Sequence, residues 1–121
     1  MPRIESPKNT PVDLISEVHA IKIARALADP TRFFIYRNII DADEMRCGDI
    51  CMETPVRAST VSHHLKVLSD AGLIKSRRMG LGVYYRPVPE ILEAYLQFLR
   101  KLRYGRKMSS IRTPTTDQEA K

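Results

Sequence analysis

Residues 58–71 read ASTVSHHLKVLSDA, and residue 72 is a glycine. Apolar residues recur in this stretch at i, i+3, i+7 and i+10, namely Ala58, Val61, Leu65 and Leu68. That spacing places them in one stripe along a helix, and a glycine directly after the stripe is typical of a helix end. Apart from Asp70, the opposite face carries hydroxyls, an imidazole and a lysine. The stretch therefore predicts a helix that buries one side and exposes hydrogen-bonding groups on the other.

The residues before this helix predict a helix-turn-helix. Residues 45–53 form a short amphipathic segment that ends at Thr54-Pro55, because the residue before a proline disfavours helical geometry. A short helix, a tight connection and a polar-faced helix make up a helix-turn-helix, whose second helix enters a major groove about 12 Å wide. We therefore expect DNA contacts from Arg57, Ser59, Thr60, Ser62, His63 and Lys66. For Arg57, a phosphate contact and a simple solvated charge both remain open.

Two strands are predicted after the polar-faced helix, over residues 73–78 and 83–88, with a hairpin turn between them. The strands carry basic residues and no acid. A basic hairpin beside a DNA groove neutralises phosphates. The expected contacts of this hairpin are Arg77, Arg78 and Arg86.

Helices are also predicted over residues 12–28, 30–42 and 89–104. Asp29 is expected to cap the middle one, with Pro30 in its first turn. That middle helix is apolar on most sides and should be central. The first and last helices carry broad apolar faces, which we expect to pack against a second copy of the chain. The expected dimer contacts are Leu14, Val18, Ile21, Ile91, Leu92, Tyr95, Leu96 and Leu99.

The composition indicates one domain. The chain has 121 residues with a net charge of +6, and residues 55–112 hold twelve basic residues against three acidic ones. This imbalance favours a polyanionic partner, although a solvated basic face would look the same. No apolar run approaches 18 residues and no secretory signal is visible, so we expect a cytoplasmic protein without a membrane partner. Residues 1–11 are expected to form a flexible arm, 12–104 the domain, and 105–121 a disordered basic and polar tail.

Several short motifs are similar to those of the ArsR/SmtB regulators. They are ALADPTR at residues 26–32, VSHHLKVL at 61–68, AGLI at 71–74, and Arg77-Arg78, Gly80 and Val83-Tyr84-Tyr85. The resemblance covers about half the chain, in the family's order and spacing. It implies a mainly α fold with a small β-hairpin wing, a winged helix-turn-helix in the order α-α-α-α-β-β-α. It also implies a homodimeric DNA-binding repressor, with the first and last helices at the dimer interface and release from operator DNA by a ligand.

Cys47 and Cys51 are the only thiols, and helical spacing would set their Cβ atoms roughly 5–6 Å apart. A disulfide needs about 3.8 Å, so we expect free thiols that share a thiophilic metal or metalloid such as As(III). Arsenic-sensing members of the resembled family read Cys-Val-Cys-Asp-Leu-Cys here, and only Cys51 matches. A third ligand would come from the other subunit or from His19, and Arg46 would lower a nearby thiol pKa. Alternatively, one cysteine is a small buried hydrophobe.

The resembled family also has a metal site on its last helix, built from Asp, His and Glu. Residues 89–104 offer only Glu90 and Glu93, so we expect that site to be absent.

The three histidines have different expected roles, either in the fold or in binding. His64 flanks the buried stripe and should be structural or phosphate-facing. His63 lies on the exposed face and should contact DNA, whereas His19 is expected to be partly buried and hydrogen-bonded.

The alternative to a repressor is a protein of another functional class, a winged helix used as a protein-interaction or sequence-neutral architectural module. An enzyme is not expected, because the chain has no phosphate-binding glycine loop, acid–base dyad or Cys-x-x-Cys motif.

Overall fold

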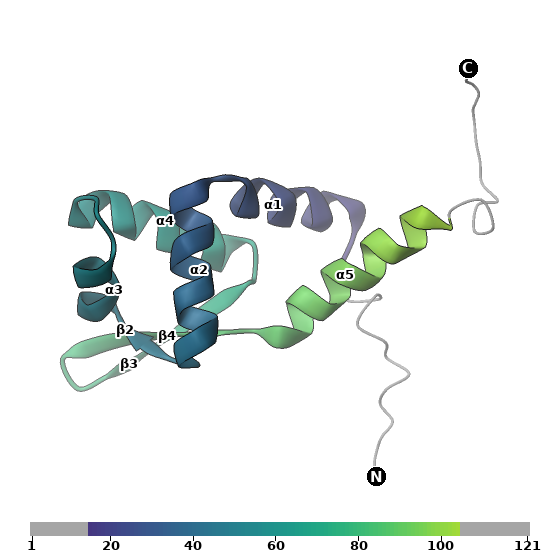
Figure 1. Cartoon of the computed structure of the whole chain (residues 1–121). Coiled ribbons are helices and arrows are strands. Elements are labelled where there is room, and N and C mark those ends of the chain that lie inside the picture. The colour runs from purple at the N-terminus through teal and green to yellow at the C-terminus, as the bar shows by residue number, and fades with distance from the viewer. Residues whose placement is uncertain (1–14, 105–121) are drawn as a thin grey trace, which may run out of the picture.

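A computed structural model describes residues 15–104, so the expected terminal arm and tail, and Leu14, lie outside the described part. Helices and strands follow one another as shown in Figure 1. They are α1 (Glu17–Ala28), α2 (Pro30–Ala42), β2 (Met45–Arg46), α3 (Cys47–Glu53), α4 (Ala58–Asp70), β3 (Ile74–Met79), β4 (Gly82–Pro87) and α5 (Pro89–Arg103). The expected order of helices and hairpin is confirmed, with one additional strand. None of the described helices is long and apolar enough to cross a membrane.

The first two helices begin at capping side chains. Ser16 Oγ accepts a hydrogen bond from the backbone N–H of His19 at 3.1 Å, so α1 begins at Glu17 and the predicted start at residue 12 was wrong. Asp29 Oδ2 accepts from the backbone N–H of Arg32 at 2.9 Å and begins α2, as predicted. Each cap satisfies an amide that has no partner within its helix.

The sheet has three antiparallel strands in the order β2-β4-β3, whereas the sequence predicted a two-stranded hairpin. Met45 pairs with Tyr85 and Arg46 with Tyr84, so the first two residues of the predicted amphipathic segment are extended and α3 begins only at Cys47. The hairpin strands lie within one residue of their predicted limits. Gly80, at φ +60°, occupies the left-handed position that a two-residue turn requires.

The core lies where α1, α2, α4 and the start of β3 meet, and its largest buried side chains include Ile23, Ile35, Leu65 and Leu73. The predicted stripe of α4 is confirmed at Val61, Leu65 and Leu68 but not at Ala58, which is exposed. His64 is buried instead, with 8% of its surface exposed.

Helix α2 is less enclosed than its composition predicts. Ile35, Tyr36 and Ile39 are buried, but Phe33 and Phe34 remain more than two-fifths exposed. The helix is therefore central on one side only.

A complete Schellman motif ends α4 and directs the chain into the sheet. The N–H of Gly72 donates to Ser69 O at 2.9 Å and that of Leu73 donates to Leu68 O at 3.1 Å. Gly72 has φ +83°, a left-handed conformation that only glycine adopts without a steric penalty.

Helix α5 packs on α1 and extends away from the sheet (Figure 1). Ala94 is its only fully buried residue among those described. Its contacts leave an uncovered apolar surface on the two helices, formed by Val18, Ile21, Leu96, Leu99 and Leu102.

Candidate nucleic-acid interface

The outward face of α4 is open to solvent. Ser59, Ser62, His63 and Lys66 are exposed there, and Thr60 is half-buried. Lys66 Nζ lies 3.3 Å from Asp70 Oδ2, an exposed i, i+4 pair of the kind that contributes only about 0.3–0.5 kcal/mol. The helix therefore presents hydroxyl and imidazole groups whose hydrogen-bonding capacity is available to a ligand.

The turn before α4 is fixed from within. Thr54 is buried, and its hydroxyl donates to Ile50 O at 2.7 Å, which ties the turn to α3. Arg57, the last residue of the turn, is exposed beside the first turn of α4. The C-terminal end of α3 is thus closed by a buried side chain, and the turn leads from it directly into α4.

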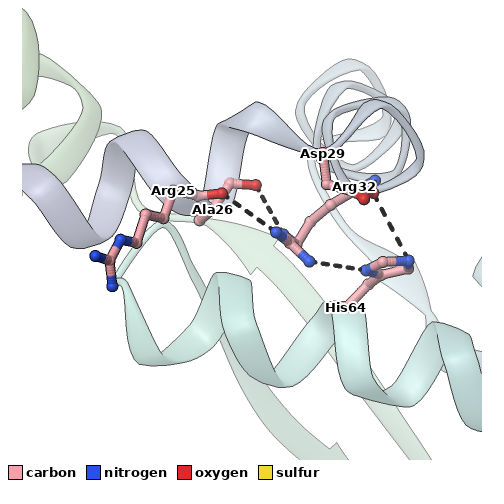
Figure 2. A network of polar contacts seen from close by, with 5 residues as sticks. All are labelled: Arg25, Ala26, Asp29, Arg32 and His64. Atoms are coloured by element: carbon pink, nitrogen blue, oxygen red, sulfur yellow. Dashed lines mark hydrogen bonds and ion pairs between the residues drawn. The ribbon is translucent and has the colours of Figure 1, made fainter.

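Arg32 connects the corner between α1 and α2 to α4 (Figure 2). Its Nε donates to Ala26 O at 2.7 Å and its Nη2 to Arg25 O at 3.2 Å. Its Nη1 lies 3.1 Å from Nδ1 of His64. Because a guanidinium only donates, Nδ1 must accept, so His64 is neutral and carries its proton on Nε2.

Burial lowers the pKa of His64, which also favours the neutral ring, despite Asp29 Oδ2 at 3.9 Å from Nε2. The structural interpretation of His64 is confirmed. Sequence reasoning did not assign Arg32 this role, although the motif at residues 26–32 contains both Arg32 and Asp29.

A second link joins α1 to the end of α4. His19 is half-buried, and its Nε2 lies 2.6 Å from Ala71 O, a carbonyl that only accepts. The expected partly buried, hydrogen-bonded histidine is confirmed, and helices α1 and α4 are tied together at both ends of α1.

The arginines of the wing, the hairpin formed by β3 and β4, are not all free. Arg77 forms a two-pronged ion pair with Glu44, at 2.9 Å from Nε to Oε2 and 3.1 Å from Nη2 to Oε1. These hydrogen bonds from Arg77 hold the pKa of Glu44 below its usual range. Arg86 Nη2 lies 3.9 Å from Asp43 Oδ2. The strands themselves have no acid, as the sequence indicated, but the turn between α2 and β2 supplies two.

Lys75 and Arg78 are also exposed on the wing, and within residues 15–104 neither has a carboxylate at ion-pair distance. The DNA contacts expected from the sequence did not include Lys75. Its exposure beside Arg86, its partner across the strands, makes it a candidate phosphate contact.

Comparison with known proteins identifies the family. The profile of a helix-turn-helix domain matches residues 27–77. A putative arsenical resistance operon repressor of Halobacterium salinarum is 34% identical over 84 residues, covering 69% of this chain and 70% of that protein. An uncharacterised HTH-type transcriptional regulator of Methanocaldococcus jannaschii is 30% identical over 83 residues, covering 69% and 93%.

The chain belongs to the ArsR/SmtB family. It is a DNA-binding transcriptional regulator of the repressor type found in that family, and it is not an enzyme.

Solved structures agree on the fold. An ArsR-like regulator from Rhodococcus sp. RHA1 superposes with a TM-score of 0.67 at 22% identity, covering 77% of this chain and 89% of that one. A homodimeric winged helix-turn-helix DNA-binding domain from Mycobacterium bovis superposes with a TM-score of 0.58 at 21% identity, covering 95% and 100%. The winged helix-turn-helix architecture expected from the sequence is confirmed.

The cysteines of this ArsR/SmtB protein lie one turn apart in α3, and both are half-buried. Burial and the neighbouring Cys51 raise the pKa of the Cys47 thiol, so the expectation that Arg46 would lower it was wrong. No three His, Cys, Asp or Glu side chains within residues 15–104 converge on a common point. His19 therefore does not complete a ligand set with these thiols in one subunit.

Proposed function

We propose that this chain is a homodimeric transcriptional repressor that reads a palindromic operator with α4 in the major groove. The observation that carries the proposal is the division of α4 into two faces. Val61, Leu65 and Leu68 fill the core while Ser62 and His63 stand in solvent. Side chains of this size bring a helix close to base edges, where hydroxyl and imidazole groups hydrogen-bond to bases.

Dimerisation would occur through α1 and α5. Ile21, Leu99 and Leu102 line a groove of about 250 Å³ between the two helices. Val18, 73% exposed, and Leu96 extend the exposed apolar surface on α1 and α5. A second copy would bury this surface. A two-fold symmetric dimer presents one α4 to each of two half-sites on the same side of the duplex. The half-sites should therefore lie about 34–36 Å apart or a multiple of that distance.

The phosphate contacts would flank the helix. Arg57 stands at its N-terminal end and Lys66 on its outer face, while Lys75 and Arg78 are exposed on the wing. Sequence-independent contacts of this kind contribute most of the salt-dependent affinity and fix the register of the protein on DNA.

The proposal includes an inducer, a thiophilic metal or metalloid such as As(III) that bridges Cys47 and Cys51. The two thiols suit a soft ion, but they do not make a closed three-thiolate site, so an external ligand or the other subunit would complete it. Because α3 packs directly against α4, an ion held on α3 would disturb the helix that reads DNA.

The test of operator binding is a footprint on the DNA upstream of the protein's own gene. A protected palindrome is expected, with scrambled DNA bound at least tenfold more weakly. Equal protection of every sequence would contradict the proposal and would favour the architectural module. Light scattering checks the dimer, and Leu99→Glu is expected to yield monomers.

The inducer is tested with Cys51→Ser in the same gel shift. The variant should bind the operator like the wild type but stay bound in arsenite that releases the wild type. Normal release of the variant, or no release of the wild type by arsenite, zinc or cadmium, would contradict this part of the proposal.

A further inference from the structure

The acidic turn, defined as Asp43 and Glu44, lies where α2 ends beside the three strands (Figure 1). Asp43 adopts a left-handed conformation with φ 69°, and its N–H donates to Ile40 O at 3.2 Å. The turn is thus fixed by the end of the helix, and both of its carboxylates reach wing arginines.

Each of the three nitrogens of the Arg77 guanidinium has a partner. Two nitrogens bind the two oxygens of Glu44, and Nη1 lies 2.8 Å from the sulfur of Met79. The Tyr84 ring centre lies 6.0 Å from its central carbon. The side chain of Glu44 is only 28% exposed, whereas that of Arg77 is 48% exposed. The pair is therefore only partly enclosed, and the guanidinium of Arg77 remains accessible from solvent.

A carboxylate and a phosphate offer the same two-oxygen geometry to an arginine fork. The oxygens of Glu44 occupy the positions at Nε and Nη2 that two phosphate oxygens would take. The DNA backbone can take the Nε–Nη2 edge of Arg77 only by displacing Glu44. The second pair, between Arg86 and Asp43, is looser at 3.9 Å and should compete less.

We propose that Glu44 competes with DNA phosphate for Arg77, so that the acidic turn lowers the sequence-independent affinity of this regulator for DNA. The inference rests on the proposed function in placing the wing beside DNA. It assigns the wing's phosphate contacts chiefly to Lys75 and Arg78, which have no such internal competitor among the described residues.

The experiment measures the dissociation constant for a random duplex between 50 and 300 mM salt for Glu44→Gln. Release of Arg77 adds one phosphate contact, which is roughly a fivefold gain in affinity at 0.1 M salt and a log–log salt slope steeper by about 0.9. Asp43→Asn should give a smaller gain. The matched control is Asp41→Asn, which removes the same charge from an exposed acid that makes no ion pair with the wing within residues 15–104. It should change affinity less than twofold.

A double variant decides whether the effect passes through Arg77. In an Arg77→Ala background, Glu44→Gln should gain no more than Asp41→Asn does. Equal gains from Glu44→Gln and Asp41→Asn, a gain that persists without Arg77, or no gain at all would each overturn the inference.

Operator selectivity is measured in a separate binding experiment with the wild-type chain. Selectivity without a Glu44 effect would overturn this inference alone. A Glu44 effect without selectivity would overturn the proposed operator reading alone.

Discussion

The outward face of α4, with Arg57 at its start, and the wing both expose cations, but these cations differ in how far acidic side chains already pair with them. On the outward face of α4 the only ion pair in the described structure is the weak, exposed one between Lys66 and Asp70. On the wing, Arg77 is held in a two-pronged contact by Glu44 and Arg86 faces Asp43. The difference shows that a count of basic residues overstates the cations without an acidic partner, and that the wing arginines are more engaged than the side chains of α4.

The largest effect is expected from removing the two α4 side chains that are proposed to read bases. In the double variant Ser62→Ala, His63→Ala, each lost base contact costs about 1–3 kcal/mol of discrimination. Operator affinity should fall at least a hundredfold, while affinity for random DNA changes little. Fluorescence anisotropy with operator and scrambled duplexes measures both. An equal loss on the two duplexes would mean that these side chains serve the fold or the backbone instead.

The next largest effect is a loss of stability on replacing Arg32, which links α4 to the corner between α1 and α2. Arg32→Ala removes three hydrogen bonds and leaves the buried His64 without its donor, so the free energy of unfolding should fall by about 3 kcal/mol. Arg32→Lys keeps the charge but not the fork, and should lose most of the same amount. Urea unfolding measures both variants, and a lysine variant as stable as the wild type would contradict the role of the fork.

Two arginines of the wing allow a paired cation, Arg77, to be compared with Arg78, which has no ion-pair partner in the described structure. Arg78→Ala should weaken binding to any duplex by roughly 1 kcal/mol and reduce the salt slope by about 0.9. Arg77→Ala should do less on both measures, because Glu44 already occupies that side chain. A salt titration of the two variants makes the comparison. Equal losses would show that the ion pair with Glu44 does not restrain Arg77.

The smallest expected effect is a pH dependence of stability from His64. Burial lowers its pKa in the folded chain, so as pH falls the unfolded chain takes up the proton first. The His64 contribution should be constant above its ordinary pKa of about 6.5 and should decrease stability below it, levelling off once the folded ring is protonated.

The His64 effect is isolated as the difference between the wild type and His64→Gln in urea unfolding between pH 5 and 8. The lowered pKa values of Asp29 and Glu44 act in a separate window, at and below their ordinary values near 4. A stability difference that does not change with pH in that range would contradict the neutral, arginine-bound ring.

Local signals in the sequence were sufficient for much of this fold. The stripe of α4, the glycine at residue 72 and the cap at Asp29 act within a few residues of one another, so periodicity and capping rules identify them. The same rules placed Ser62 and His63 on the exposed face.

The features that were not predicted depend on long-range partners. Glu44 and Arg77 are separated by 33 residues, and Arg32 and His64 by 32. Strand β2 has only two residues and forms because β4 offers a free edge, which no local propensity reveals. The raised pKa of Cys47 likewise follows from burial that exists only in the folded chain.

Selection of bound sequences from a random duplex library tests the central claim most directly, with the wild type and the Ser62→Ala, His63→Ala variant side by side. The account predicts that the wild type enriches a two-fold symmetric sequence with half-sites about ten base pairs apart or a multiple of that spacing, and that the variant loses this enrichment. A wild type that enriches no sequence, or a variant that enriches the same one, would contradict the assignment of α4 as the helix that reads DNA.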